Sequence, residues 1–472
     1  MSDDLDIAER EPAEAEGLLP FRDVDGRLGR DWLDSLGAHI DAGDKDDVVR
    51  LMAPLLAADT GEALQALESG QRVALIGFLG DRFDYEALTH VDDGIRYELI
   101  DSLSSAAVAR GVKGLASNDA VYILEDIDAP DREEILSHLP TFERLALKRS
   151  LDFPEESAGR RMQTDFIAIP PYWTAGQTID YLRDEGELPD EFYQIYVVDP
   201  SYKLLGTISL DRILRAKREQ SIEAIMNANV IEVAAEEDQE EAARVFERYD
   251  LVEVAVVDEG GRLVGVLTID DIVDVIHEEA SEDFRLLAGV GDEEVSDNVW
   301  NTVKSRVTWL VVNLLTAILA SAVIGIFKGT IEQMVALAVL MPIVASMGGN
   351  AGTQTMTVTV RALATRQLDP FNMRRLITRE ALVGLVNGVV FAVLIGVVAT
   401  VWFGSVELGL VIAAAMVVNM VAAGISGILI PIGLERLNID PAVASSAFVT
   451  TITDVVGFFA FLGLAAVWFG FF

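Results

Sequence analysis

The spacing of hydrophobic residues changes twice along the chain and divides it into three parts. From about residue 31 to 157, apolar residues recur every three to four positions in short pieces that end at Gly, Pro or Asp. This pattern predicts a compact array of amphipathic helices. Between 162 and 279, short β-branched runs alternate with helical pieces. Beyond residue 300 the apolar runs become much longer, so we predict a multi-domain chain that ends in an all-α polytopic membrane domain.

The middle part contains an internal repeat. The runs 195–199 and 254–258, each followed by a turn and a second apolar run, align without gaps at an offset of 59 residues. This offset pairs Val198 with Val257 and Gly206 with Gly265. A gap-free repeat of strand, turn, strand and helix indicates two copies of one α/β unit. It resembles a tandem pair of CBS domains, although another α+β duplication would give a similar pattern.

The last part predicts five membrane spans, because each apolar run reaches the ~20 residues that a helix needs to cross the hydrocarbon core. The runs are 307–327, 334–359, 381–403, 408–431 and 444–470. Basic residues gather on one side of this arrangement, at Lys304, Arg306, Arg361, Arg366, Arg374, Arg375, Arg379 and Arg436, and only Lys328 falls on the other. The positive-inside rule therefore predicts a cytosolic N-terminus and an outward C-terminus in the plasma membrane.

Charge separates the same parts. Residues 1–300 hold 69 acidic against 27 basic residues, whereas 301–472 hold 7 against 9. So large an acidic excess is typical of surfaces adapted to a high-salt cytosol, and most of these carboxylates are expected to be solvated. The acidic start of the chain is unlike a signal peptide. The chain has no Cys and only four scattered His, and no catalytic constellation, so we do not expect an enzyme.

Asp454 is the ionisable residue that lies well inside a predicted span. A buried carboxylate in hydrocarbon is costly and by default indicates a functional site, although a hydrogen bond to a neighbouring helix is an alternative. Thr450 lies one turn earlier and could face the same lumen. Asp440 precedes Pro441 and reads as the N-cap of this span, near the cytosolic mouth. Carboxylate and hydroxyl oxygens suit Mg²⁺ better than soft metals.

The second span carries an unusual run of small and amide residues at 341–354. Gly348 and Gly349 would weaken a lipid-facing helix but are tolerated inside a bundle. Asn350 and Gln354 place amide oxygens on one helical face. Close helix packing through small residues would give the same pattern and is compatible with pore lining.

These features together resemble the MgtE family of magnesium channels. The resemblance rests on the proline- and glycine-rich run at 341–354, the T-x-T-D-V-V-G-F-F segment around Asp454, the joint at 157–162, the CBS pair and the helical N-domain. It implies a homodimer with a central pore, in which Asp454 is the pore acid and Asp440 the inner-mouth acid. It also implies a connecting "plug" helix that senses cytosolic Mg²⁺.

The resemblance further implies a set of regulatory acids. They are Asp271, Asp274, Glu279, Glu282 and Asp283 on the connecting stretch and, less directly, Glu240 and Asp250 on the second CBS repeat. Asp119 and Glu125 are candidates for bridging acids of the N-domain. By themselves these acids would be interpreted as a solvated acidic face, since like charges at such spacing repel unless a cation lies between them.

Nucleotide binding by the CBS pair is in doubt. Arg212 stands where the ribose-binding Asp of an S/T-x-x-D motif would lie in the first repeat, and in the second repeat Asp271 is needed for cation sensing. We therefore expect weak or absent ATP binding.

The sequence predicts a Mg²⁺ channel or transporter that cytosolic Mg²⁺ closes, with the lipid bilayer, divalent cations and a second copy as partners and no nucleic acid. A CBS-regulated transporter of Co²⁺ or Mn²⁺ is the alternative. The expected organisation is an acidic disordered lead-in (1–28), the helical N-domain (29–159), the CBS pair (160–279), the connecting helix (280–305) and the membrane domain (306–472).

Overall fold

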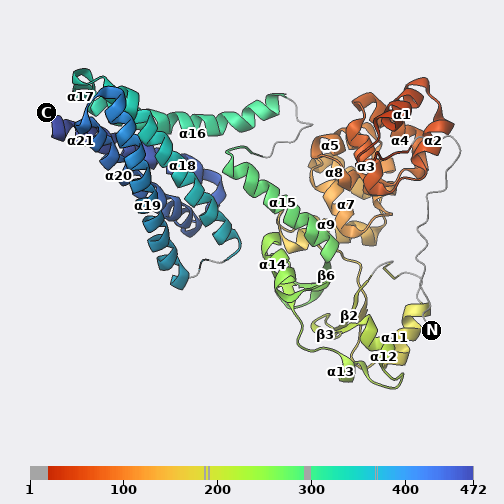
Figure 1. Ribbon diagram of the computed structural model, residues 1–472. Helices are drawn as coiled ribbons and strands as arrows, with labels where there is room; N and C mark the ends of the chain where they lie inside the picture. Colours follow the sequence, from red (N-terminus) through yellow and green to blue (C-terminus); the bar gives the residue numbers. More distant parts are fainter. Residues whose placement is uncertain are drawn as a thin grey trace, which may run out of the picture. The chain divides into compact units, whose positions relative to one another are not determined.

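The computed structural model describes residues 20–184, 188–189, 192–291, 299–366, 368 and 370–470. The chain forms two compact units, Met1–His277 and Glu278–Phe472, and each is considered by itself. Figure 1 traces both units from the N-terminus to the C-terminus. A helical N-domain, a CBS-like pair and long apolar helices follow one another along the chain, so the predicted fold class is confirmed.

The first unit begins with short helices that bury one apolar face each. They are α1 (Arg30–Ala42), α2 (Lys45–Met52), α3 (Ala57–Ala66), α4 (Ser69–Leu79), α5 (Asp93–Ser102), α6 (Ser105–Val112), α7 (Ser117–Glu125), α8 (Ala129–Ser137) and α9 (Thr141–Leu151), with 3-10 turns η1 (Gly80–Arg82) and η2 (Tyr85–His90). Trp32, Leu64 and Leu99 are almost fully buried in one shared core. The three- and four-residue apolar spacing thus produces the expected helical array.

The segment just before α1 differs from the predicted disordered lead-in. Arg22 and Leu28 form an antiparallel bridge, and Phe21 and Leu28 pack against the core of the N-domain. Burial of these two apolar side chains explains why residues 20–28 are ordered. Residues 1–19 of the predicted lead-in lie outside the described residues.

The rest of the first unit holds two small sheets built in the same way. Their elements are α10 (Ala158–Arg161), β1 (Ala168–Ile169), α11 (Ala175–Asp184), β2 (Gln194–Val198), β3 (Leu204–Ser209), α12 (Leu210–Arg215), α13 (Ile222–Ile225), β4 (Glu232–Ala234), α14 (Gln239–Tyr249), β5 (Glu253–Val257) and β6 (Leu263–Thr268). β1 is parallel to β2, which is antiparallel to β3, and β4, β5 and β6 repeat this order. The register shifts at Val197/Val198 in one sheet and at Val256/Val257 in the other, in keeping with the 59-residue repeat.

The connecting segment is not the single helix expected over 280–305. Helix α15 (Ile269–Leu287) starts directly after β6 and runs across the boundary between the units. Gly289 then adopts a positive φ of 71°, a conformation that a glycine adopts without steric cost. Residues 292–298 lie outside the described residues, and α16 begins at Val299.

The second unit contains five helices, within its described residues, that are long and apolar enough to span a membrane. They are α16 (Val299–Ile326), α18 (Ala336–Ala364), α19 (Pro370–Phe403), α20 (Val406–Arg436) and α21 (Pro441–Phe469), and a short helix, α17 (Lys328–Gln333), precedes α18. All five predicted spans therefore correspond to helices. Helix α20 is the most buried of them, with Ile412 and Ala423 fully enclosed by its neighbours.

Glycines allow the long helices to approach closely. A β-carbon on Gly424 would lie 2.8 Å from the carbonyl oxygen of Glu380, and one on Gly427 would lie 2.7 Å from that of Gly352. Such contacts are too short for a real side chain, so α20 can pack against both α18 and α19 only because these positions carry none.

Candidate functional site

Helices α18 and α21 meet at the segments that the sequence singled out. A β-carbon on Gly349 would lie 3.8 Å from Cγ2 of Thr450, and one on Gly352 would lie 2.5 Å from Cγ1 of Val449. The structure therefore brings the glycine-rich run of α18 against the turn of α21 that precedes Asp454.

Asp454 is half-buried on α21. Among the described residues, its carboxylate has no hydrogen bond or ion pair, which is unusual for an acid in an apolar bundle. The Thr450 hydroxyl donates to the carbonyl oxygens of Ser446 and Ala447 in its own helix, and its two lone pairs stay available. The Asp440 carboxylate accepts a 2.7 Å hydrogen bond from the Ala442 amide and caps α21, which confirms the predicted N-cap.

A polar stripe covers one exposed face of α18. Ser346, Asn350, Gln354 and Thr357 follow one another at spacings of three or four residues, and all four are exposed in a single copy of the bundle. Gly348, by contrast, is buried against α20. Polar side chains on the outside of an apolar helix require a polar neighbour or water, because hydrocarbon satisfies no hydrogen bond.

Asn419 on α20 was missed by sequence reasoning. Its side chain is fully buried, and its Nδ2 donates a 2.8 Å hydrogen bond to the carbonyl oxygen of Val344 on α18. Its amide fills the space that Gly348 and Gly457 leave open on the two pore-candidate helices. The signal in the sequence was a single amide within an otherwise apolar span.

Glu380 on α19 was also missed, because the predicted third span began one residue later. It is 9% exposed and accepts a 3.3 Å hydrogen bond from the hydroxyl of Thr355 on α18. Arg379 lies 3.8 Å from its other carboxylate oxygen. Asp454 is thus accompanied by a second acid inside the described part of the bundle, although Glu380 is paired.

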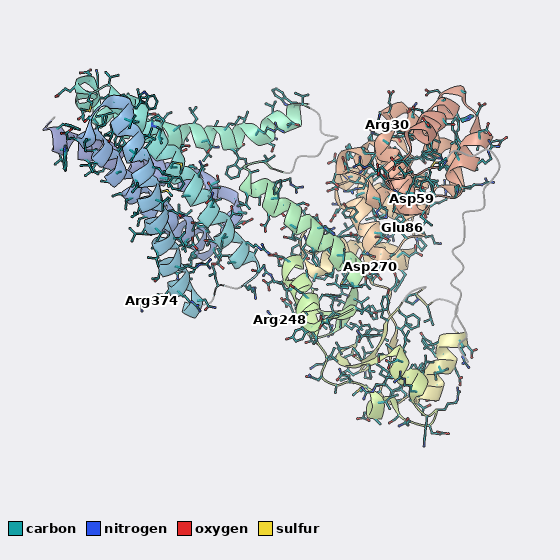
Figure 2. The ribbon with its side chains drawn as sticks, viewed as in Figure 1. Arg30, Asp59, Glu86, Arg248, Asp270 and Arg374 are labelled. Carbon is teal, nitrogen blue, oxygen red and sulfur yellow. The ribbon has the colours of Figure 1, made fainter. Side chains whose placement is uncertain are left out.

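The first unit contains an open cavity of about 1470 Å³ with acidic walls. The carboxylates that line it are Asp84, Glu86, Asp119, Asp165, Asp258, Asp270, Asp271 and Asp274. Figure 2 labels Glu86 in the N-domain and Asp270 at the start of α15. The predicted sensor acids Asp271 and Asp274 therefore share a cavity with the predicted bridging candidate Asp119.

Asp271 is held by three neutral donors. It accepts hydrogen bonds from Asn118 Nδ2 at 2.6 Å, Thr268 Oγ1 at 2.8 Å and Gln163 Nε2 at 3.2 Å. Burial raises the pKa of Asp271 to about 6. The hydrogen bond from Thr268 opposes this shift, whereas the negative charges of Asp270 and Asp274 add to it. Burial, and then the charges of Asp271 and Glu86, raises the pKa of Asp119 to about 7. Carboxylates with raised pKa values therefore lie close together here, and a bound cation would reduce the repulsion between their negative charges.

The other predicted acids lie elsewhere. Glu279, Glu282 and Asp283 lie on the part of α15 that belongs to the second unit. Glu240 pairs with Arg244 at 2.6 Å in the first turn of α14, and Asp250 ends that helix in a left-handed conformation with φ 51°. Their role as ligands stays a prediction.

Glu125 is surrounded by arginines. Arg161 and Arg160 lie 3.8 Å and 3.9 Å from its carboxylate oxygens. Burial nevertheless raises the pKa of Glu125 to about 7, with the two arginines opposing this effect. These cationic neighbours make Glu125 a poorer cation ligand than Asp119.

The side chains that were considered for nucleotide binding form hydrogen bonds within their own repeat. Ser209 Oγ donates a 2.6 Å hydrogen bond to Asp211, and this bond lowers the pKa of Asp211. In the second repeat, Thr268 donates to Asp271. Weak ATP binding stays a prediction.

The sequence matches three protein-family descriptions in the order of the domains. Residues 55–156 match the MgtE intracellular N domain, residues 158–219 and 222–278 match the CBS domain, and residues 341–464 match the MgtE family of divalent cation transporters.

The chain is similar to curated and solved proteins. It is 32% identical to the magnesium transporter MgtE of Bacillus subtilis over 78% of this chain and 82% of that protein. It is 36% identical to the magnesium transporter MgtE of Thermus thermophilus over 66% of this chain and 70% of that protein. Two crystal structures are 26% identical: the soluble part of a magnesium transporter (53% of this chain, 98% of that one, TM-score 0.47) and the cytosolic domain of the Mg²⁺ channel MgtE in complex with ATP (52% and 99%, TM-score 0.35). Because both the relatives and the family matches extend over most of the chain, this protein belongs to the MgtE family and is a multi-pass membrane transporter of magnesium.

Proposed function

We propose that two copies of the chain form a Mg²⁺ channel in the plasma membrane, which cytosolic Mg²⁺ closes. The observation that carries the pore is the polar stripe of α18. Ser346, Asn350, Gln354 and Thr357 are exposed on a helix that must lie in a membrane, and two copies facing each other across water would satisfy all four. Asp454, half-buried and without a partner among the described residues, supplies the negative charge of this pore.

Mg²⁺ loses its water reluctantly, so the ion is expected to pass largely hydrated. Two Asp454 carboxylates, one from each copy, would hold it through water molecules. Asp440 lies 14 residues earlier at the start of α21, about 21 Å along the helix at ~1.5 Å per residue. It would attract cations at the cytosolic mouth, with the basic loops and the N-terminus on the same side.

The acidic cavity of the first unit supports the gating. Asp119 on α7 and Asp270, Asp271 and Asp274 on α15 repel one another when no cation is present. A bound Mg²⁺ would offset this repulsion and tie the N-domain to α15. In the second unit, Leu286 and Leu287 at the end of α15 pack against Met356 of α18 and Val449 of α21. A helix held in this way can bias the two pore helices between open and closed arrangements.

The test is Mg²⁺ flux into proteoliposomes, with the cytosolic face exposed to either no Mg²⁺ or millimolar Mg²⁺. We expect rapid flux in the first condition and at least about tenfold slower flux in the second, because Mg²⁺ binds the closed state more tightly. Asp454→Asn keeps the size of the side chain and removes its charge, so flux should fall to the level of empty vesicles in both conditions.

Glu407→Gln is the matched control, since this exposed acid lies in the first turn of α20 and is hydrogen-bonded to Ser405. Its flux should match that of the parent chain. Normal flux through Asp454→Asn would show that Asp454 has a structural role only. Competition of Co²⁺ and Mn²⁺ with Mg²⁺ in the same vesicles tests the alternative cations.

A further inference from the structure

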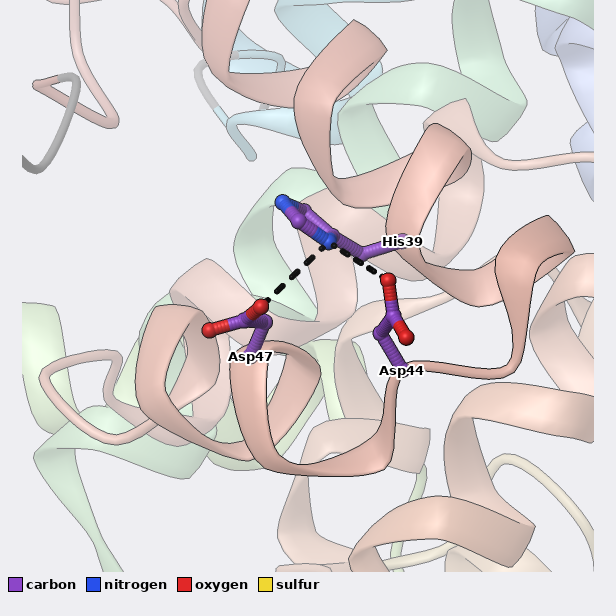
Figure 3. A group of neighbouring side chains, drawn as sticks. All are labelled: His39, Asp44 and Asp47. Carbon is purple, nitrogen blue, oxygen red and sulfur yellow. Dashed lines mark ion pairs between the residues drawn. The ribbon is translucent and has the colours of Figure 1, made fainter.

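The turn between α1 and α2 brings three metal-ligating side chains together. Gly43 follows α1 with a φ of 76°, and the amides of Gly43 and Asp44 donate to the carbonyl oxygens of Ile40 and His39. This motif ends α1 tightly and reverses the chain into α2. As a result His39, Asp44 and Asp47 point into one space (Figure 3).

The distances within this group are those of ligands around a shared ion. His39 Nδ1 lies 3.5 Å from Asp44 Oδ2 and 3.7 Å from Asp47 Oδ2, and all three atoms lie within 4.8 Å of one another. These separations exceed the roughly 2.7–3.2 Å of a hydrogen bond. Two ligands bound at about 2.0–2.1 Å in a near-tetrahedral arrangement lie roughly 3.3–3.6 Å apart, close to the separations seen here.

The surroundings leave these atoms available. Arg50 binds Oδ1 of Asp47 at 2.7 Å, while Oδ2, the oxygen nearer His39, accepts no hydrogen bond from the described residues. Asp44 is the N-cap residue of α2, and Asp47 lies in the first turn of that helix. His39 lies in the last turn of α1. Its side chain is 33% exposed, so an ion can reach the nitrogen from solvent.

We propose that His39, Asp44 and Asp47 bind a transition-metal dication of the Zn²⁺ class, with water in the remaining coordination positions. One imidazole nitrogen and two carboxylate oxygens suit Zn²⁺, Co²⁺ or Mn²⁺, whereas Mg²⁺ prefers oxygen ligands alone. The group lies before residue 55, where the match to the MgtE intracellular N domain begins. None of the three residues lines the acidic cavity.

The experiment titrates Zn²⁺ into the full-length chain in detergent micelles, without an affinity tag, by calorimetry. Saturating Mg²⁺ is present throughout, so that oxygen-only acidic sites are filled. We expect one class of Zn²⁺ sites that His39→Ala abolishes. Asp44→Asn and Asp47→Asn should each weaken it by at least about tenfold, since each removes one charged ligand.

Two controls separate this site from the acidic surface. Asp46→Asn neutralises an exposed neighbour in the same helical turn, and His138→Ala removes another histidine of the N-domain. Both variants should bind Zn²⁺ as the parent does. Zn²⁺ should also raise the unfolding temperature of the parent and of Asp46→Asn, but not that of His39→Ala, because a ligand stabilises only the state that binds it.

Unchanged Zn²⁺ binding by His39→Ala would overturn the proposal, because the metal would then be held elsewhere. The absence of any Zn²⁺ binding in saturating Mg²⁺ would overturn it as well, since Mg²⁺ is not expected to displace Zn²⁺ from an imidazole-containing site. A far-ultraviolet circular dichroism spectrum identical to that of the parent establishes that His39→Ala is folded.

Discussion

Asn419 contacts three of the membrane helices at once. It reaches from α20 to the carbonyl oxygen of Val344 on α18, and its amide occupies space beside Gly457 on α21. Its Oδ1 has no partner in the described structure although it is fully buried. A buried amide of this kind fixes the relative position of helices in an apolar environment, where few other polar contacts compete.

Asn419→Ala is expected to destabilise the membrane unit by about 1–3 kcal/mol, because the Val344 carbonyl loses its donor and a cavity remains. Mg²⁺ flux should fall as well, since Gly348 and the turn around Asp454 are no longer held together. Thermal unfolding in detergent and proteoliposome flux measure the two effects. Asn313→Ala, at an exposed position of α16, should change stability by less than about 0.5 kcal/mol. Equal behaviour of the two variants would contradict the role given to Asn419.

At the scale of elements, polar and acidic side chains of α7 lie against acids at the start of α15. Asn118 on α7 donates to Asp271, whereas its neighbour Asp119 faces the negative charges of Asp271 and Glu86. The pKa values of Asp119 and Asp271 are raised above 3.8, so the folded state binds more protons than the unfolded state between about pH 4 and 7. The stability that these groups contribute is therefore fully present at low pH and is lost as the pH rises through their folded pKa values.

Asp119→Asn should make the first unit more stable near pH 7.5 in the absence of Mg²⁺ and flatten the pH dependence of its stability between about pH 4 and 7. In the parent, Mg²⁺ should restore stability at about pH 7.5 and have little effect near pH 5, because metal ligands must be deprotonated. Thermal unfolding of the full chain across this range, with and without Mg²⁺, measures both effects.

Asp101→Asn, an exposed acid on α5, is the matched control and should resemble the parent. A pH profile of Asp119→Asn that superimposes on that of the parent would mean that Asp119 titrates normally and takes no part in cation binding.

For the whole molecule, gating requires that Mg²⁺ bind one state more tightly than the other. A variant with Asn or Gln at Asp271, Asp274, Glu279, Glu282 and Asp283 loses both the repulsion and the ligands. A ligand without differential affinity shifts no equilibrium, so this variant should conduct at cytosolic Mg²⁺ concentrations that close the parent. Proteoliposome flux at constant monovalent salt is the measurement, since salt screens the same repulsion.

The control for this variant neutralises five acids within residues 1–19, where no ligand is predicted. It should close with Mg²⁺ as the parent does. If both variants respond to Mg²⁺ alike, the α15 acids are solvated surface, as the overall acidic composition would suggest.

Local spacing along the chain was sufficient for the architecture. Each span, each copy of the repeat and the Asp440 cap is defined by residues close together in sequence. All three features are present in the structure. Helical and strand periodicities report burial directly, because each places apolar side chains on one face. The intramembrane position of Asp454 rests on the same reasoning and stays a prediction.

Only the tertiary structure brought together residues that are distant along the chain. Asn118 and Asp271 are 153 positions apart, and Asn419 and Val344 are 75 apart. No periodicity links such pairs, because their contact depends on how separate elements pack. The same holds for the pairing of Glu380 with Thr355, which the sequence did not distinguish from an acid at a span end. Sequence thus determined which segments form helices long and apolar enough to span a membrane, whereas packing decided which polar groups meet, since hydrogen bonds and charge repulsion act through space and not along the chain.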